Sequence, residues 1–119
     1  MTAAEVARVL SGFSYLVVAE VDLQVGVLMA LTRAGITFER EVCLSRGRAD
    51  RIDFLVGAVG IECKVDGSLQ EVTRQLHRYA QDPAVAELVL VTTRARHAAV
   101  PRSLAGKPVH VVATRGGLR

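Results

Sequence analysis

The chain has 119 residues and half of them are hydrophobic, so we expect residues 1–119 to build one compact domain. The apolar runs are short and interrupted by charge, and the start lacks the pattern of a secretory signal, which favours a cytoplasmic protein without membrane contact. A formal charge of +3, supplied mainly by Arg, is typical of a protein with a polyanionic partner, whereas the absence of Trp argues against a base-stacking platform.

The first predicted elements are two helices and a strand. Thr2 is a favourable N-cap for a helix over 3–11. Apolar residues at helical spacing predict a second helix over 17–34, which Gly35 ends. Its predicted buried positions are Val21, Val25, Leu28 and Leu31. Alternating residues predict a strand over 37–44, with one common face formed by Phe38, Arg40, Val42 and Leu44.

Residues 51–64 predict a hairpin of two apolar strands that each carry an acid. A two-residue turn at 57–58 suits type II′ geometry because Gly57 comes first, and this register places Asp53 opposite Glu62. Directly opposed residues have Cβ atoms roughly 4.5–5.5 Å apart. A bulge at Gly60, or a slip by one residue, would separate the acids.

The remaining elements complete an α/β pattern. A helix over 69–81 begins after Ser68, and the near-continuous apolar run 87–93 predicts a strand buried on both faces. We expect a helical turn over 101–105 and a last edge strand over 108–114. The order helix, three strands, helix, strand predicts a mixed sheet flanked by helices, with a parallel crossover after the third strand.

Asp53 and Glu62 predict a cation site. Charges inside apolar strands are costly unless they are compensated, and a divalent cation compensates two carboxylates. Carboxylate oxygens suit Mg²⁺ or Mn²⁺. Lys64 shares a strand face with Glu62, where it would orient a water that attacks an anionic substrate. The alternative is a structural ion pair of these acids with Lys64 or Arg51.

Asp53, the hairpin and the triplet Glu-Cys-Lys at 62–64 together resemble the core motif of the PD-(D/E)xK nucleases, the restriction-endonuclease-like superfamily. Ile52 replaces the proline that usually precedes the aspartate. Gln75 and Tyr79 are similar to the Gln-x-x-x-Tyr element of the RecB-like branch. The resemblance implies a restriction-endonuclease-like αβββαβ core with Mg²⁺ or Mn²⁺ as the cofactor.

The resemblance also implies roles for further residues. Glu20, on the first core helix, would be an additional acid at the metal, with Asp22 as its local competitor. The backbone carbonyl of Cys63 would complete the metal coordination, while its side chain packs. Glu39 and Glu41 either approach the hairpin acids or form a solvated strand face.

Gln75 and Tyr79 share one helix face, so Gln75 would hold a phosphate or the attacking water and Tyr79 would contact a nucleic-acid backbone. The alternative is an ordinary helix surface with a half-buried tyrosine. Further candidates for phosphate contact, or else for solvated surface, are Arg46, Arg48, Arg51, Arg74 and Arg78. The scattered His77, His97 and His110 are expected to be non-catalytic, and Cys43 and Cys63 to be buried free thiols.

These observations together predict a Mg²⁺-dependent endonuclease that hydrolyses DNA phosphodiester bonds, with Asp53, Glu62, Lys64 and Gln75 as catalytic residues. The chain is too short for a base-reading domain, so we expect structure-selective or sequence-nonspecific cleavage. Small family members include Holliday-junction resolvases, which implies a homodimer, with 108–113 as one candidate interface. The alternatives are a non-catalytic nucleic-acid-binding or regulatory domain, and a defence or restriction effector that needs a partner chain.

Overall fold

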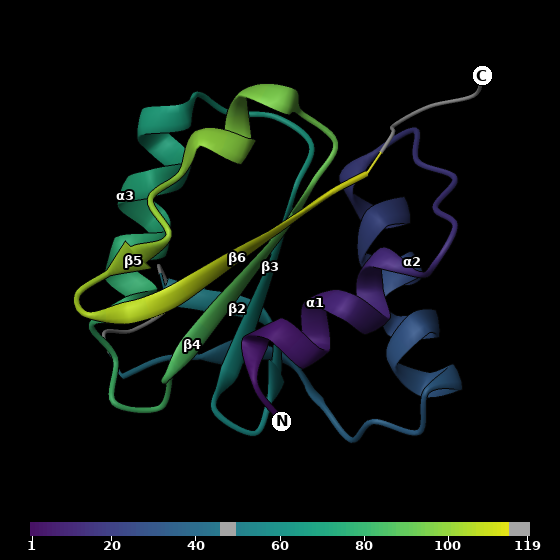
Figure 1. Ribbon diagram of the computed structural model, residues 1–119, viewed down its shortest axis with the longest axis horizontal. Helices are drawn as coiled ribbons and strands as arrows, with labels where there is room; N and C mark the ends of the chain where they lie inside the picture. Colours follow the sequence, from purple (N-terminus) through teal and green to yellow (C-terminus); the bar gives the residue numbers. More distant parts are fainter. Residues whose placement is uncertain (46–49, 115–119) are drawn as a thin grey trace.

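The computed structural model describes residues 1–45 and 50–114, which form a mixed six-stranded sheet with helices on both faces (Figure 1). The strand order is β1-β2-β3-β4-β6-β5. The strands are β1 (Glu39–Cys43), β2 (Arg51–Val56), β3 (Val59–Lys64), β4 (Glu87–Thr92), β5 (Ser103–Leu104) and β6 (Lys107–Ala113). The first three form an antiparallel meander, and β3, β4 and β6 run parallel, which confirms the predicted α/β class and the parallel crossover.

The helices are α1 (Ala3–Ser11), α2 (Glu20–Arg33), α3 (Leu69–Ala80) and a short 3₁₀ helix (Ala95–Ala99). Helices α1 and α2 cover one face of the sheet, which we call the α2 face, and α3 covers the opposite α3 face (Figure 1). The predicted caps are confirmed, because Thr2 and Ser68 each accept the backbone N–H of a glutamate three residues later. No helix in residues 1–45 and 50–114 has both the length and the hydropathy that crossing a bilayer requires.

The hairpin of β2 and β3 has the predicted register. Its backbone pairs run from Val56 and Val59 at the turn to Phe54 and Ile61. Gly57 has a φ of +59°, the left-handed conformation that the first position of a type II′ turn needs. The local turn chemistry therefore fixes which residues of the two strands lie opposite each other.

Along both β1 and β2, the side chains switch from one face of the sheet to the other at the same level. Phe54 packs on the α2 face and Ile52 on the α3 face, although residues two apart share a face in a regular strand. Phe38 and Val42 of β1 are divided in the same way, and Glu41 between them has a left-handed φ of +52°. The single face predicted for the β1 segment is therefore wrong.

Helix α2 buries Leu31 and part of Leu28 as predicted, but its N-terminal half buries a different side from the one predicted. Val21 and Val25 are 59% and 46% exposed, whereas Leu23 and Val27 are fully buried. The reason lies at Gly26, which faces the ring of Tyr15 so closely that an added Cβ would lie 2.5 Å from a ring carbon. Both sides of the helix are apolar, and only the glycine side allows this close packing.

Two smaller predictions are also wrong. Residues 101–105 are not a helical turn, because they contain β5, which turns through Ala105 and Gly106 into β6. Cys63 is a buried free thiol as predicted, but Cys43 is exposed because it lies on the edge strand β1.

Gly60 provides a test of the packing between the hairpin and β4. A Cβ at this position would lie 2.5 Å from Ile52 Cδ1 and 3.1 Å from Leu88 Cδ2, and both side chains are fully buried. We expect Gly60→Ala to lower the free energy of unfolding by about 1–3 kcal/mol in urea denaturation, because the added methyl group would force buried side chains to shift. The control Gly12→Ala, whose Cβ would meet nothing closer than 3.6 Å, should be nearly neutral. Equal stabilities of the two variants would contradict the described packing.

Candidate functional site

The candidate site forms where β2 and β3 stop pairing through their backbones. Beyond the pair of Phe54 and Ile61, side chains supply the hydrogen bonds between the strands. The backbone N–H of Asp53 donates to Glu62 Oε1 at 3.2 Å, and the backbone N–H of Cys63 donates to Asp53 Oδ2 at 2.8 Å. The two acids thus connect the strands at the level that the sequence predicted.

The pair of a half-buried Asp53 and a buried Glu62 is electrostatically unfavourable when both groups are ionised. Glu62 is 4% exposed, and burial together with repulsion from Asp53 raises its pKa to about 8. Burial also raises the pKa of Asp53, although the hydrogen bond from Cys63 opposes this shift. The ammonium of Lys64 lies 3.6 Å from Glu62 Oε2 and favours the ionised form. One lysine therefore compensates the pair only in part.

Helix α3 covers the acid pair from one side. The hydroxyl of Tyr79 lies 3.3 Å from Glu62 Oε2 and 3.2 Å from the carbonyl oxygen of Arg51, and it can donate to either. Gln75 Nε2 donates to the same hydroxyl at 2.8 Å. Tyr79 is fully buried, so its position does not allow the predicted contact with a nucleic acid. Its role in the structure is to hold the Glu62 carboxyl in place.

Helix α2 approaches the pair from the other face of the sheet. Gln24 Nε2 donates to Asp53 Oδ1 at 3.3 Å, a contact that the sequence analysis missed. The sequence does hold a signal for this contact, because Gln24 comes four residues after Glu20 and therefore lies on the same helix face. Glu20 lies near enough for its charge to raise the pKa of Glu62. Asp22 is not a competitor, because it caps the helix by accepting the backbone N–H groups of residues 18 and 19.

Glu41 of β1 is a further acid near the site. Its charge makes the smallest of the contributions to the pKa of Asp53, and both Glu39 and Glu41 are exposed, as expected for a solvated strand face. Glu41 is also the residue whose left-handed backbone accompanies the change of face in β1 and β2. Such backbone conformations cost free energy in non-glycine residues and are concentrated at functional sites.

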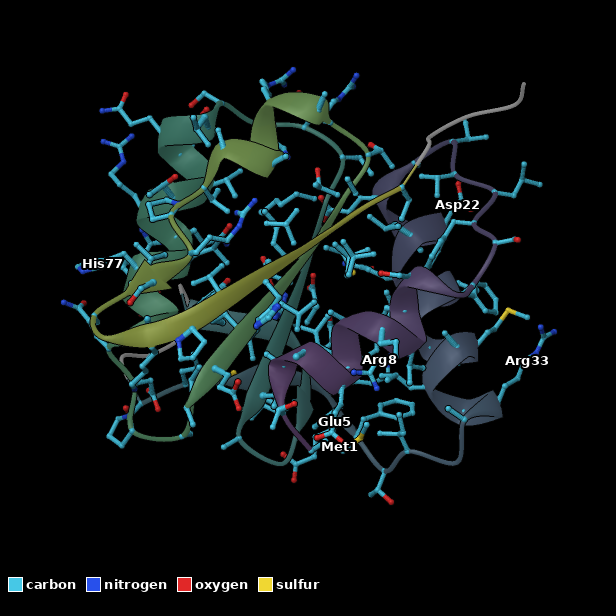
Figure 2. All side chains as sticks on the ribbon, in the orientation of Figure 1. Met1, Glu5, Arg8, Asp22, Arg33 and His77 are labelled. Carbon is cyan, nitrogen blue, oxygen red and sulfur yellow. The ribbon has the colours of Figure 1, made fainter. Side chains whose placement is uncertain are left out.

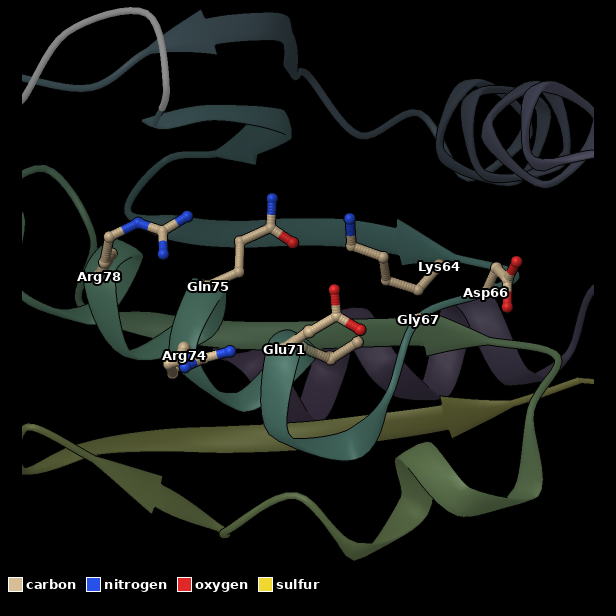
Figure 3. A pocket seen from close by; sticks show the side chains of 8 residues that line it. Lys64, Asp66, Gly67, Glu71, Arg74, Gln75 and Arg78 are labelled. Carbon is tan, nitrogen blue, oxygen red and sulfur yellow. The ribbon is translucent and has the colours of Figure 1, made fainter.

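A cleft of about 430 Å³ lies beside the acid pair, between the end of β3 and α3. Figure 3 shows the amide of Gln75 between the side chains of Arg78 and Lys64 along this cleft. Arg78 Nε donates to the buried carboxylate of Asp50 at 3.0 Å, which fixes the guanidinium and leaves its other N–H groups for a ligand. Arg74 also lines the cleft and is exposed.

Some predicted site residues are not brought into this arrangement. Arg46 and Arg48 lie outside the described residues. Arg51 has an exposed side chain, and only its backbone carbonyl reaches Tyr79. The thiol of Cys63 packs in the core of the α2 face, as predicted, and its backbone N–H is the group that reaches Asp53.

His97 has a structural environment, in agreement with the expectation that it is not catalytic. It is fully buried, with Nδ1 2.6 Å from Thr92 Oγ1 and Nε2 2.8 Å from the carbonyl oxygen of Gly67. Arg96 donates to the same carbonyl, and Arg94 donates to the carbonyl of Val65. These contacts anchor the loop that follows Lys64 and borders the cleft.

Comparison of the chain with protein-family models, curated proteins and solved structures found no match. Residue roles therefore rest on the contacts described above. Among the residues that the structure describes, no group of three or more Asp, Glu, His or Cys side chains is arranged to hold a metal ion. The possible protein donors are the carboxyl groups of Asp53 and Glu62, with Glu20 and Glu41 nearby.

The buried acids predict a pH-dependent stability in the absence of divalent cations. A carboxyl whose pKa is raised by folding binds its proton more tightly in the folded state, so stability is lost as pH rises from the unfolded value of 4.5 towards about 8. Glu62→Gln removes this titration. Between about pH 5 and pH 8 in EDTA, we expect the wild type to lose at least about 1 kcal/mol relative to this variant in urea unfolding. Parallel pH profiles of the two proteins would contradict the described burial of Glu62.

Proposed function

We propose that this protein is a divalent-metal-dependent nuclease that hydrolyses DNA phosphodiester bonds on a restriction-endonuclease-like core. The observation that carries the proposal is the pair of Asp53 and Glu62, with Lys64 beside it and an adjoining cleft. The charged residues that line this cleft are Lys64, Arg74 and Arg78, together with the acids Asp66 and Glu71. Two carboxylates at this position repel each other when both are ionised, and a cation bound between them would offset that repulsion. The adjoining cleft offers positive groups to an anionic substrate.

The residues at the site fit a divalent cation. Asp53 and Glu62 are hard oxygen donors whose pKa values are raised mainly by burial, and for Glu62 also by repulsion from Asp53. Among the described residues, each carboxyl oxygen has one hydrogen-bond donor and keeps further acceptor capacity. Mg²⁺ in nucleic-acid enzymes is held by one or two carboxylates together with waters and substrate oxygens, so two donors suffice. Glu20 and the backbone carbonyl of Cys63 are the proposed additional ligands.

The bound cation, Mg²⁺ or Mn²⁺, would polarise the scissile phosphate and lower the pKa of the attacking water. Lys64 is 22% exposed, so its ammonium can reach the substrate and stabilise the charge that develops on the phosphate oxygens. Gln75 gives one amide N–H to Tyr79, and its second N–H and its carbonyl oxygen have no partner among the described residues, so they would be available to a phosphate or a water. Tyr79 and Gln24 keep the two carboxyl groups oriented.

The cleft supports a backbone-directed mode of substrate binding. Arg74 and Arg78 present guanidinium groups that suit phosphate oxygens, while Trp is absent from the sequence. Contacts to phosphates carry no sequence information, so we propose sequence-nonspecific or structure-selective cleavage. The alternative is a non-catalytic nucleic-acid-binding domain, because such a domain would need only the cleft and not the acid pair.

Cleavage assays on linear, nicked, flap and four-way-junction DNA test this proposal. We expect cleavage with Mg²⁺ or Mn²⁺ and none in EDTA. Asp53→Asn and Lys64→Met should each lower the rate by at least about a hundredfold, because each removes charge at the reacting phosphate. The control Glu71→Gln changes a cleft residue outside the acid pair and should cleave normally.

A cation-binding measurement separates the nuclease from the alternative. Mn²⁺ should raise the thermal unfolding temperature of the wild type but not of Asp53→Asn, since only a ligand of the folded state stabilises it. DNA binding without cleavage and without such a Mn²⁺ effect would reject the nuclease and favour the non-catalytic domain.

The arginines of the cleft generate a separate prediction about DNA affinity. Arg74→Ala should weaken binding equally for unrelated DNA sequences and reduce the slope of log affinity against log salt by about one, as expected for one lost phosphate contact. The control Arg8→Ala removes an exposed arginine from α1, on the α2 face of the sheet. Fluorescence anisotropy over a salt series measures both variants, and equal slopes for the two would remove Arg74 from the interface.

A further inference from the structure

Helix α2 and the turn before it expose an apolar strip that the fold does not use. Val21, Val25 and Met29 follow one another at four-residue spacing and therefore line one side of the helix, and Val18 extends this line. Val18 is 80% exposed. We call these four residues the α2 strip. Among the described residues, the other large hydrophobic side chains with comparable exposure are Met1 and Leu16, and Leu16 lies next to the strip in sequence.

The strip lies opposite the side by which α2 joins the protein core. Leu23, Val27 and Leu31 are fully buried under the sheet side of the helix, so the core is complete without the strip. Valine is a poor helix former, and a polar residue would serve better at a solvated position. A continuous exposed apolar surface of this kind is typical of a protein contact.

The charges at the two ends of α2 indicate which partner fits. Asp22 lies in the first turn and Arg33 in the last, as Figure 2 shows at the two ends of the helix. They are eleven residues apart, close to three whole turns, so both lie on the same flank of the strip. When two copies of a helix pack antiparallel about a twofold axis, the same flank of each copy lies on the same side of the contact. Such a pair would place Asp22 beside Arg33 of the second copy, and it would also align the helix dipoles favourably.

We propose that the α2 strip packs against the α2 strip of a second copy of this chain, with the two helices antiparallel about a twofold axis. The register that joins Asp22 to the partner's Arg33 also sets Val25 beside the partner's Met29, so the charged and apolar contacts form together. This contact differs from the 108–113 edge considered from the sequence, where Val109 and Val112 are buried in the protein's own core.

The same helix carries Gln24 and Glu20 towards the acid pair, so the second copy would fix the position of two residues at the site. The inference itself does not rest on the proposed nuclease function. It concerns association, and a dimer without nuclease activity would leave it intact.

Sedimentation equilibrium of the full chain tests the proposal. We expect the wild type to have about twice its chain mass of 12.8 kDa at about 100 µM. Val25→Glu should be monomeric, with the dissociation constant raised at least about tenfold, because it places a charge in the apolar contact. The control Ala58→Glu adds the same charge at the exposed hairpin turn and should remain dimeric.

The charged contact has its own readout. Arg33→Asp should weaken the dimer by setting acid against the partner's Asp22, whereas Arg8→Asp on α1 should not. Circular dichroism confirms that each variant is folded. A wild type that is monomeric at every concentration would overturn the proposal, and so would a Val25→Glu variant that stays dimeric, which would point to the 108–113 edge instead.

Discussion

Two carboxyl groups join β2 to β3 at the level where the backbones of these strands no longer pair. Asp53 and Glu62 each accept a backbone N–H from the opposite strand, and this exchange lies between the two helical layers, with Glu62 buried and Asp53 half-buried. The distorted backbone at Glu41 belongs to the same irregularity, since both strands change face at that level. The site is therefore a break in the regularity of the sheet that side chains have to close.

The surroundings of this break follow from its electrostatic cost. Gln24 donates from one side of the sheet and Tyr79 from the other, and Lys64 supplies the nearest positive charge. These contacts do not offset the cost of burial, which is the main reason that the pKa values of both acids are raised. In the proposed function, a divalent cation and a phosphate drawn into the neighbouring cleft would complete the balance.

The sequence predicted the features that depend on local rules. Gly57 fixed the turn, the turn fixed the register, and the register placed Asp53 opposite Glu62. It could not predict the orientation of α2, because both sides of that helix are apolar and the choice depends on how Gly26 meets Tyr15. For the same reason the contact of Gln24 was missed. The burial of Tyr79 likewise depends on how α3 lies over the sheet, which no local pattern encodes.

The packing of α3 over Glu62 affects how the protein folds during its synthesis. The ribosome releases the β2–β3 hairpin before α3, so an early hairpin holds its acids in contact with water. Hydration is lost only when Tyr79 and its helix settle onto the sheet. At neutral pH that step favours uptake of a proton, because Glu62 becomes a much weaker acid as it is enclosed. Folding of the nascent chain is thereby linked to the pH of its surroundings.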